Sequence, residues 1–201
     1  LGGSSSINAM IYMRGQKSDY DHWESLGNKG WGWNDVLPYF IKSENQERGK
    51  SEYHGVDGPL SVSDTRIKLE LLEKFMDAAQ EKGIPKVNDF NKGDNFGCGY
   101  FQVTEKNGLR CSAAVGYLNP IKKRKNLKIE INCHVQKINF DGKLASSVSY
   151  WKNNQTHTIN ANKEILLSAG SIGSPQILQT SGVGNSEKLK NLGIKIINDL
   201  K

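Results

Sequence analysis

The sequence predicts an α+β chain in which amphipathic helices and short strands are separated by glycine-containing turns. Apolar residues recur at helical spacing over residues 67–79, and the period changes to two over residues 127–159. A uniformly apolar strand at 164–168 then runs directly into a glycine turn and a helix. Such a strand is typical of one that is buried on both faces of a sheet.

Length and composition favour a globular protein with no transmembrane segment. The 201 residues are 36% hydrophobic and 24% charged, and no apolar run approaches the roughly 20 residues needed to cross a bilayer. The chain begins Leu1-Gly2-Gly3, without an initiator Met or a signal sequence. We therefore expect it to be the central part of a longer protein.

The formal charge of +6 does not point to nucleic acid. The excess is Lys spread along the chain, and the densest basic cluster, at 122–125, has no interleaved aromatic residues. The 3 cysteines are widely spaced and form no C-x-x-C pair, which argues against a disulfide framework or a zinc site. We expect no nucleic-acid partner, no metal, and a reducing compartment: the cytoplasm, or the periphery of the inner membrane.

In the first half of the chain the pattern predicts helices and strands in alternation. Asn34 is a good N-cap for the helix expected at 35–42, and Asp64 or Thr65 can cap the second helix, which is expected at 67–79. The apolar stripe of the second helix is expected to be core. The expected helices span 35–42, 67–79 and 112–118, and the expected strands span 58–62 and 100–104.

In the second half we expect an antiparallel meander followed by a β-α-β unit. Turns such as Asp141-Gly142 and Asn153-Asn154 separate the meander strands. Pro175 suits the first turn of a helix. The expected strands span 127–131, 135–140, 146–151, 156–159, 164–168 and 194–197, and the expected helices span 175–180 and 186–192.

Two small-residue turns have the composition of phosphate-binding segments. Ala169-Gly170-Ser171 opens a helix after the strand at 164–168, where unpaired N–H groups attract anions. The run from Gly2 to Ser6 can form a nest of N–H donors. A structural turn in the first case and a flexible terminus in the second would have the same composition, so both readings stay open.

Taken together, these turns belong to two longer patterns. Residues 2–15, GGSSSINAMIYMRG, resemble the first signature of the glucose-methanol-choline (GMC) oxidoreductases, and residues 170–184, GSIGSPQILQTSGVG, resemble the second. The segments 54–60 and 110–114 are similar to the choline dehydrogenase and bacterial alcohol dehydrogenase branch. The resemblance covers essentially the whole chain.

The resemblance implies part of an FAD-binding Rossmann-like domain that carries the antiparallel β-meander, together with part of a substrate-side domain. Residues 1–15 and 108–201 would belong to the FAD-binding domain. Residues 16–107 would form a connecting region and part of the substrate domain.

The resemblance also implies FAD as the cofactor and a set of residues that contact it. Some relatives attach FAD covalently through a His at the position of Ile7, and Ile has no nucleophilic nitrogen, so non-covalent FAD is implied. The implied cofactor-binding residues are Gly2, Gly3, Ser4, Asn8, Ala9, Met10, Ile11, Val135, Ala169 and Gly170.

The implied activity is oxidation of the CH–OH group of choline or another primary alcohol, with hydride transfer to the flavin. The partner is thus a small-molecule alcohol, and the electron acceptor is unassigned. The family's pyrophosphate-binding G-x-G-x-x-G turn and late catalytic His have no counterpart in this sequence. We assign no catalytic residue, interpret His22, His54, His134 and His157 as structural or solvated, and expect the chain alone to be inactive. A GMC-type oxidase or lyase, or a non-catalytic nucleotide-binding domain, are the alternatives.

Overall fold

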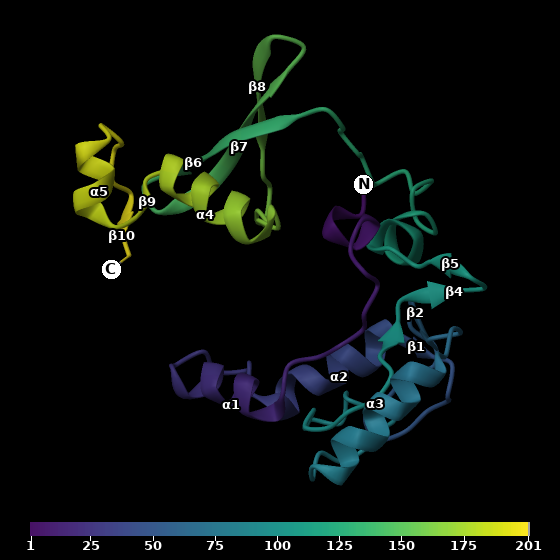
Figure 1. Cartoon of the computed structure of the whole chain (residues 1–201). Helices are drawn as coiled ribbons and strands as arrows, with labels where there is room; N and C mark the ends of the chain where they lie inside the picture. The colour runs from purple at the N-terminus through teal and green to yellow at the C-terminus, as the bar shows by residue number, and fades with distance from the viewer. Residues whose placement is uncertain (201) are drawn as a thin grey trace. The chain divides into compact units, whose positions relative to one another are not determined.

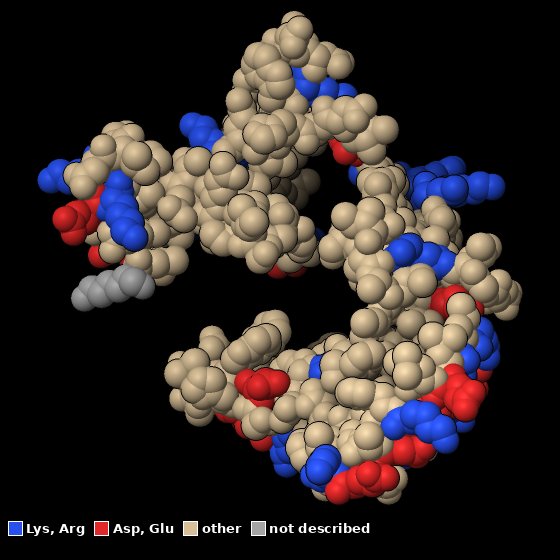
Figure 2. All heavy atoms as spheres, viewed as in Figure 1, with Lys and Arg blue, Asp and Glu red and all other residues tan. Residues whose placement is uncertain are grey.

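The computed structural model describes residues 1–200, which form two compact units divided between Leu127 and Lys128 (Figure 1). Unit 1 ends at Leu127 and unit 2 begins at Lys128. Helices and sheets are mixed along the chain, which confirms the predicted α+β class. Over the part of unit 1 in view, Lys and Arg side chains are interspersed with Asp and Glu (Figure 2).

A small mixed sheet lies at the centre of unit 1. Strand β1 (Glu44–Gln46) pairs in parallel with β2 (Leu60–Asp64), and β2 pairs antiparallel with β3 (Gln102–Val103). Val62 in β2 is fully buried. The neighbouring hairpin of β4 (Glu105–Lys106) and β5 (Leu109–Arg110) is followed by the short π-helical segment η2 (Ala114–Leu118).

Helices α1 (Lys17–Ser25) and α2 (Trp33–Ser43) pack together through aromatic rings. The Tyr20 ring lies 5.8 Å from that of Trp33 and 5.7 Å from that of Phe40. The sequence pattern does not predict α1, because its residues are mostly polar. Its start is stabilised locally, since the Asp19 carboxylate accepts a hydrogen bond from Gln16 N–H at 2.7 Å.

The predicted N-caps of α2 and α3 are wrong. Helix α2 begins at Trp33, one residue before Asn34, because the Trp33 N–H donates to Asp21 Oδ1 of α1 at 3.0 Å. Helix α3 (Glu70–Glu81) begins well after Asp64 and Thr65, since both residues make other interactions. Asp64 lies in β2, and Thr65 Oγ1 donates to the Phe101 carbonyl at 2.6 Å.

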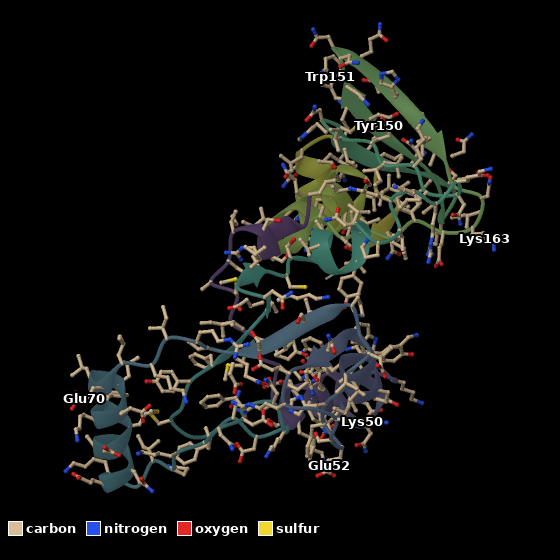
Figure 3. All side chains as sticks on the ribbon, turned by 90° about the vertical axis from the view of Figure 1, so that its right-hand side faces the viewer. Lys50, Glu52, Glu70, Tyr150, Trp151 and Lys163 are labelled. Atoms are coloured by element: carbon tan, nitrogen blue, oxygen red, sulfur yellow. The ribbon has the colours of Figure 1, made fainter. Side chains whose placement is uncertain are left out.

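The apolar stripe of α3 is not core among the described residues, contrary to the prediction (Figure 3). Met76 is the one buried residue of this helix, whereas Leu71 is 79% exposed and Phe75 is 65% exposed. Periodicity shows that a helix has an apolar face but not which segment covers it. The helix ends at Glu81, and Gly83 then adopts a left-handed conformation with φ 84°.

Unit 2 is built on the predicted meander. Strands β6 (His134–Asp141), β7 (Leu144–Lys152) and β8 (Gln155–Asn160) form an antiparallel sheet in the order β6-β7-β8. Asn153 and Asn154 have φ of 50° and 59°, the left-handed pair that a tight hairpin turn requires. Figure 3 labels Tyr150 and Trp151, which are successive residues of β7 and therefore point to opposite faces of the sheet.

Helix α4 (Gly170–Thr180) packs against β6. Ile177 of α4 and Ile138 of β6 are both buried, and Thr180 Oγ1 donates to the Gln136 carbonyl at 3.0 Å. The helix begins at Gly170 rather than at Pro175, because Ser174 Oγ accepts the Ala169 N–H at 2.9 Å and stabilises the preceding turn. Pro175 therefore lies inside the helix.

The predicted strands at 127–131 and 164–168 are wrong, since neither segment pairs with another strand among residues 1–200. Leu166, in the middle of the second segment, is 81% exposed. A strand exists only where a neighbour accepts and donates its backbone hydrogen bonds. The apolar run at 164–168 carries the composition of a buried strand without such a neighbour in the described chain.

A parallel β-α-β unit is present, but with different strands from those predicted. Strand β9 (Val183–Gly184) pairs in parallel with β10 (Asn198–Asp199), and α5 (Ser186–Asn191) connects them. The predicted strand at 194–197 is thus displaced toward the C-terminus. Asn185 Oδ1 caps α5 by accepting Lys188 N–H at 3.0 Å, and Leu189 is fully buried.

Candidate functional site

The glycine and serine residues at the start of unit 1 form a tight turn. Gly2 has φ 100° and precedes a single 3₁₀ turn, η1 (Gly3–Ser6). A Cβ on Gly2 would meet Ser6 Oγ, which can rotate away, and would press against the Ala114 Cβ, so the main obstacle to a side chain is the left-handed conformation. Ser5 Oγ accepts Ala113 N–H at 2.9 Å, which ties the turn to η2.

Asn8 organises the residues that follow this turn. Its Oδ1 accepts the Met10 N–H at 3.0 Å and Arg110 Nη1 at 2.9 Å, and Arg110 Nη1 also reaches the Ser5 carbonyl at 3.1 Å. Neither bond to Asn8 uses its amide nitrogen, which stays available as a donor. Met10 is held at φ 62°, a left-handed conformation that is uncommon for a residue with a long side chain.

Residues 10–12 run antiparallel along β3. Thr104 N–H donates to the Met10 carbonyl at 2.8 Å, and Tyr12 N–H donates to the Gln102 carbonyl at 2.8 Å. Ile11 is therefore a non-hydrogen-bonded partner of Val103, and its N–H and C=O point away from β3. This geometry leaves a polar backbone edge at Ile11, whose side chain is 47% exposed.

Behind this segment lies a buried cluster of charged side chains, which we call the buried charge network: Arg14, Glu44, His54 and Asp89. Arg14 Nη2 lies 2.9 Å from Glu44 Oε2, with both side chains at most 1% exposed. His54 Nδ1 lies 2.9 Å from the same oxygen, and His54 Nε2 lies 3.0 Å from Asp89 Oδ2. Four separate segments of the chain contribute these residues.

The network is electrically balanced because His54 is cationic. Burial alone lowers the pKa of His54, but hydrogen bonds to Asp89 and Glu44 outweigh burial and raise the pKa to about 9. Burial likewise raises the pKa of Asp89, but the bonds from His54 and from the Asn91 N–H lower it overall. Two buried cations thus face two buried carboxylates, and both ring nitrogens of His54 donate.

No sequence motif predicts a site role for this network. His54, which we expect to be structural or solvated, is buried and ion-paired and is therefore structural. Arg14 lies inside the first signature, but its partners Glu44 and Asp89 carry no local motif. Glu44 and Gln46 lie on the same side of β1 and both are buried, but no sequence signal marks them, because the segment that follows Glu44 is polar and contains glycine.

The remaining predicted cofactor-binding residues lie in unit 2. Val135 is half-buried in β6 opposite Tyr150, next to an irregularity in the pairing of β6 with β7. Ala169 and Gly170 are exposed at the start of α4, and Gly170 has φ 85°. The predicted residues Gly2, Gly3, Ser4, Asn8, Ala9, Met10 and Ile11 all lie within one short stretch of unit 1.

Among residues 1–200 there is no cluster of His, Cys, Asp and Glu with the arrangement of a metal site. No helix in the described chain combines the length and apolarity required to span a membrane.

The family is established by comparison with known proteins. The family model described as GMC oxidoreductase matches residues 1–197. The chain therefore belongs to the GMC oxidoreductase family, as the two signature segments predict.

Individual relatives are similar to the chain over nearly its whole length. The chain is 44% identical over 196 residues to the mitochondrial choline dehydrogenase of Homo sapiens, covering 98% of this chain and 33% of that protein. It is also 44% identical over 204 residues to the oxygen-dependent choline dehydrogenase of Pectobacterium atrosepticum, covering 100% of this chain and 36% of that protein. A solved FAD-dependent oxidoreductase from Chaetomium thermophilum matches with a TM-score of 0.92 and 38% identity, covering 99% of this chain and 37% of that one. The chain thus spans about a third of the length of the curated relatives it matches.

Proposed function

We propose that the chain is part of an FAD-dependent oxidoreductase that oxidises the CH–OH group of choline or another primary alcohol. The observation that carries this proposal is the polar edge formed by Asn8 and Ile11 within a chain of the GMC family. The matched solved structure is named an FAD-dependent oxidoreductase, and the two curated relatives are named choline dehydrogenases. When bound, FAD supplies the acceptor for the hydride of the alcohol.

The residues present fit a flavin. Residues 2–6 carry only hydrogen atoms or short hydroxymethyl groups as side chains, so their backbone offers a close approach to a cofactor. The Asn8 amide nitrogen and the Ile11 N–H can donate to polar atoms of the ring, and the Ile11 carbonyl can accept from it. We propose that Gly2, Gly3, Ser4, Asn8, Ala9, Met10 and Ile11 contact FAD. Unit 2 would contribute Val135, Ala169 and Gly170.

We further propose that FAD binds without a covalent bond. Ile7, at the position where some family members carry the linking His, is aliphatic and 86% exposed. An exposed Ile7 side chain can contact a flavin but cannot bond to it.

The domain assignment follows the same reasoning. We propose that residues 1–15 and 108–201 belong to the FAD-binding domain, and that residues 16–107 connect it to the substrate domain and form part of the latter. We assign the removal of the alcohol proton to none of the described residues. We propose the cytoplasm or the periphery of the inner membrane as the location.

An oxidase is the second candidate function, because one relative is named an oxygen-dependent choline dehydrogenase. The two candidates differ only in the electron acceptor. Choline turnover by the full-length protein that consumes oxygen would favour the oxidase. Turnover that requires an artificial acceptor would favour the dehydrogenase.

The cofactor proposal is tested by acid precipitation of the full-length protein. All yellow chromophore should appear in the supernatant, whereas flavin that stays with the precipitate would refute non-covalent binding. The substitution Asn8→Ala should weaken FAD binding by about 1 to 3 kcal/mol, the range for leaving a buried polar partner unsatisfied. The control Asn34→Ala, at an exposed position of α2, should leave FAD affinity unchanged. Equal affinities of the wild type and Asn8→Ala would remove Asn8 from the site.

A further inference from the structure

We propose that Glu44 and Arg14 are positioning residues that hold the flavin-contacting segment, residues 8–11, in its binding conformation. The inference rests on the proposed FAD site. Neither side chain is available to a ligand, since both are at most 1% exposed. Two hydrogen-bonded routes lead from them to Tyr12 and Arg14, which follow that segment along the chain.

The first route runs through Arg14 itself. Its Nη2 bonds Glu44, its Nη1 reaches the Tyr53 carbonyl at 2.7 Å, and its Nε reaches Tyr12 Oη at 3.2 Å. Arg14 N–H donates to Asn91 Oδ1 at 2.8 Å. The guanidinium and the main chain of Arg14 are thus fixed independently, which leaves the residues just before it little freedom to move.

The second route runs through paired glutamines. Gln46 Nε2 donates to Glu44 Oε1 at 3.1 Å and to Gln102 Oε1 at 2.9 Å, and Gln102 Nε2 donates back to Gln46 Oε1 at 2.8 Å. The carbonyl of Gln102 accepts the Tyr12 N–H at 2.8 Å. Glu44 is therefore linked through two side chains to the strand along which residues 10–12 lie.

Because the charges of this network balance, the loss of any one of them leaves another buried charge without a partner. Because His54 is cationic and donates from both nitrogens, the two amide hydrogens of Gln46 go to Glu44 and Gln102. A buried carboxylate that loses one of its cations remains uncompensated in a low dielectric, so its neighbours rearrange to satisfy it. Rearrangement at Glu44 would be passed to Met10, which already has a left-handed conformation that needs external support.

The test compares Glu44→Gln with Glu47→Gln in the full-length protein. Glu47 is an exposed carboxylate just beyond β1 that pairs with Arg66 at the surface. Because the loss of a buried charge in Glu44→Gln is expected to destabilise the fold, Gln102→Met serves as a second variant. It cuts the glutamine route while all four buried charges remain. Each variant is measured at a temperature at which far-UV circular dichroism shows the apoprotein folded.

Two readouts separate positioning from a merely structural role: the Kd for FAD, and the visible circular dichroism of the bound flavin. We expect Glu44→Gln and Gln102→Met to raise the Kd roughly 5- to 100-fold, the range for an unsatisfied buried group near the cofactor, and to alter the flavin spectrum. Glu47→Gln should change neither. Arg14→Lys, which keeps the charge but loses the forked contacts, should give an intermediate Kd.

The inference would be overturned by a folded Glu44→Gln or Gln102→Met protein that has the wild-type Kd for FAD and the wild-type flavin spectrum. This holds provided that Asn8→Ala still weakens the binding of FAD. If the wild-type full-length protein binds no FAD, the proposed function itself fails. The two failures are therefore distinguishable.

Discussion

His54 is held between two carboxylates, with Nδ1 2.9 Å from Glu44 Oε2 and Nε2 3.0 Å from Asp89 Oδ2. His54 lies in the loop between β1 and β2, and it thereby links Glu44 of β1 to the segment that contains Asp89. The consequences for stability can be measured.

The stability of the protein should fall as the pH rises toward about 9. The folded-state pKa of His54 is about 9, above its ordinary value of 6.5. The stabilisation is therefore complete below pH 6.5 and is lost as the pH rises through about 9. Urea unfolding across this range should show a loss on the order of 1–3 kcal/mol in the wild type. The free energy of unfolding of His54→Gln should depend much less on pH over the same range. An NMR titration that places the His54 pKa near 6.5 would contradict this prediction.

Replacing Arg14 by an apolar residue of similar length should be strongly destabilising. Arg14→Met leaves Glu44 without its guanidinium partner in a fully buried position, and breaking a buried pair in this way costs about 3 to 5 kcal/mol. Denaturant unfolding measures the loss. The matched control is Arg66→Met, because Arg66 forms an exposed pair with Glu47 at 2.6 Å. Solvent screens that pair, so its removal should leave the free energy of unfolding nearly unchanged. Similar losses in both variants would argue against the buried charge network.

Gly55 should not tolerate a methyl group. A Cβ there would overlap the Ile41 carbonyl oxygen, and the Gly55 N–H also donates to Glu44 Oε2 at 3.2 Å. Gly55→Ala should therefore destabilise the protein by about 1 to 3 kcal/mol or more, as overpacking does. At Gly49, with φ 99° and open space around it, alanine should cost only about 1 kcal/mol of backbone strain. Thermal unfolding of both variants shows which is the less stable. A Gly49→Ala protein less stable than Gly55→Ala would show that Gly55 does not lie against the Ile41 carbonyl oxygen.

In unit 2, Ser181 should contribute measurably to the packing of α4 on β6. Its Oγ accepts the Ile138 N–H at 2.8 Å, and both residues are buried. Ser181→Ala leaves that N–H without a partner, at a cost of about 1 to 3 kcal/mol. Ser171→Ala, in the exposed first turn of α4, is the control and should be nearly neutral. Hydrogen exchange at the Ile138 amide should accelerate in Ser181→Ala alone.

Local patterns in the sequence predict the parts of the fold that depend on near neighbours. The alternation over residues 135–159 and the Asn153-Asn154 turn predict the meander, because each hairpin strand pairs with the next one along the chain. Residues 2–15 and 170–184 likewise carry the family signatures, which the match over residues 1–197 confirms.

Other features required the tertiary structure. The run at 164–168 has the composition of a buried strand but has no pairing partner among residues 1–200, and the apolar face of α3 is exposed there. Composition specifies what a segment can pack against, whereas pairing and coverage depend on which distant segments meet it.

The sequence alone determined that this chain belongs to the GMC oxidoreductases, because the family signatures are contiguous segments that are recognised without knowledge of the fold. Only the tertiary structure decided that Arg14, Glu44, His54 and Asp89 form one neutral cluster behind the Asn8 segment. The reason is physical: the burial and pKa of a charged side chain are set by groups far away in sequence. No local pattern records which carboxylate will meet which cation.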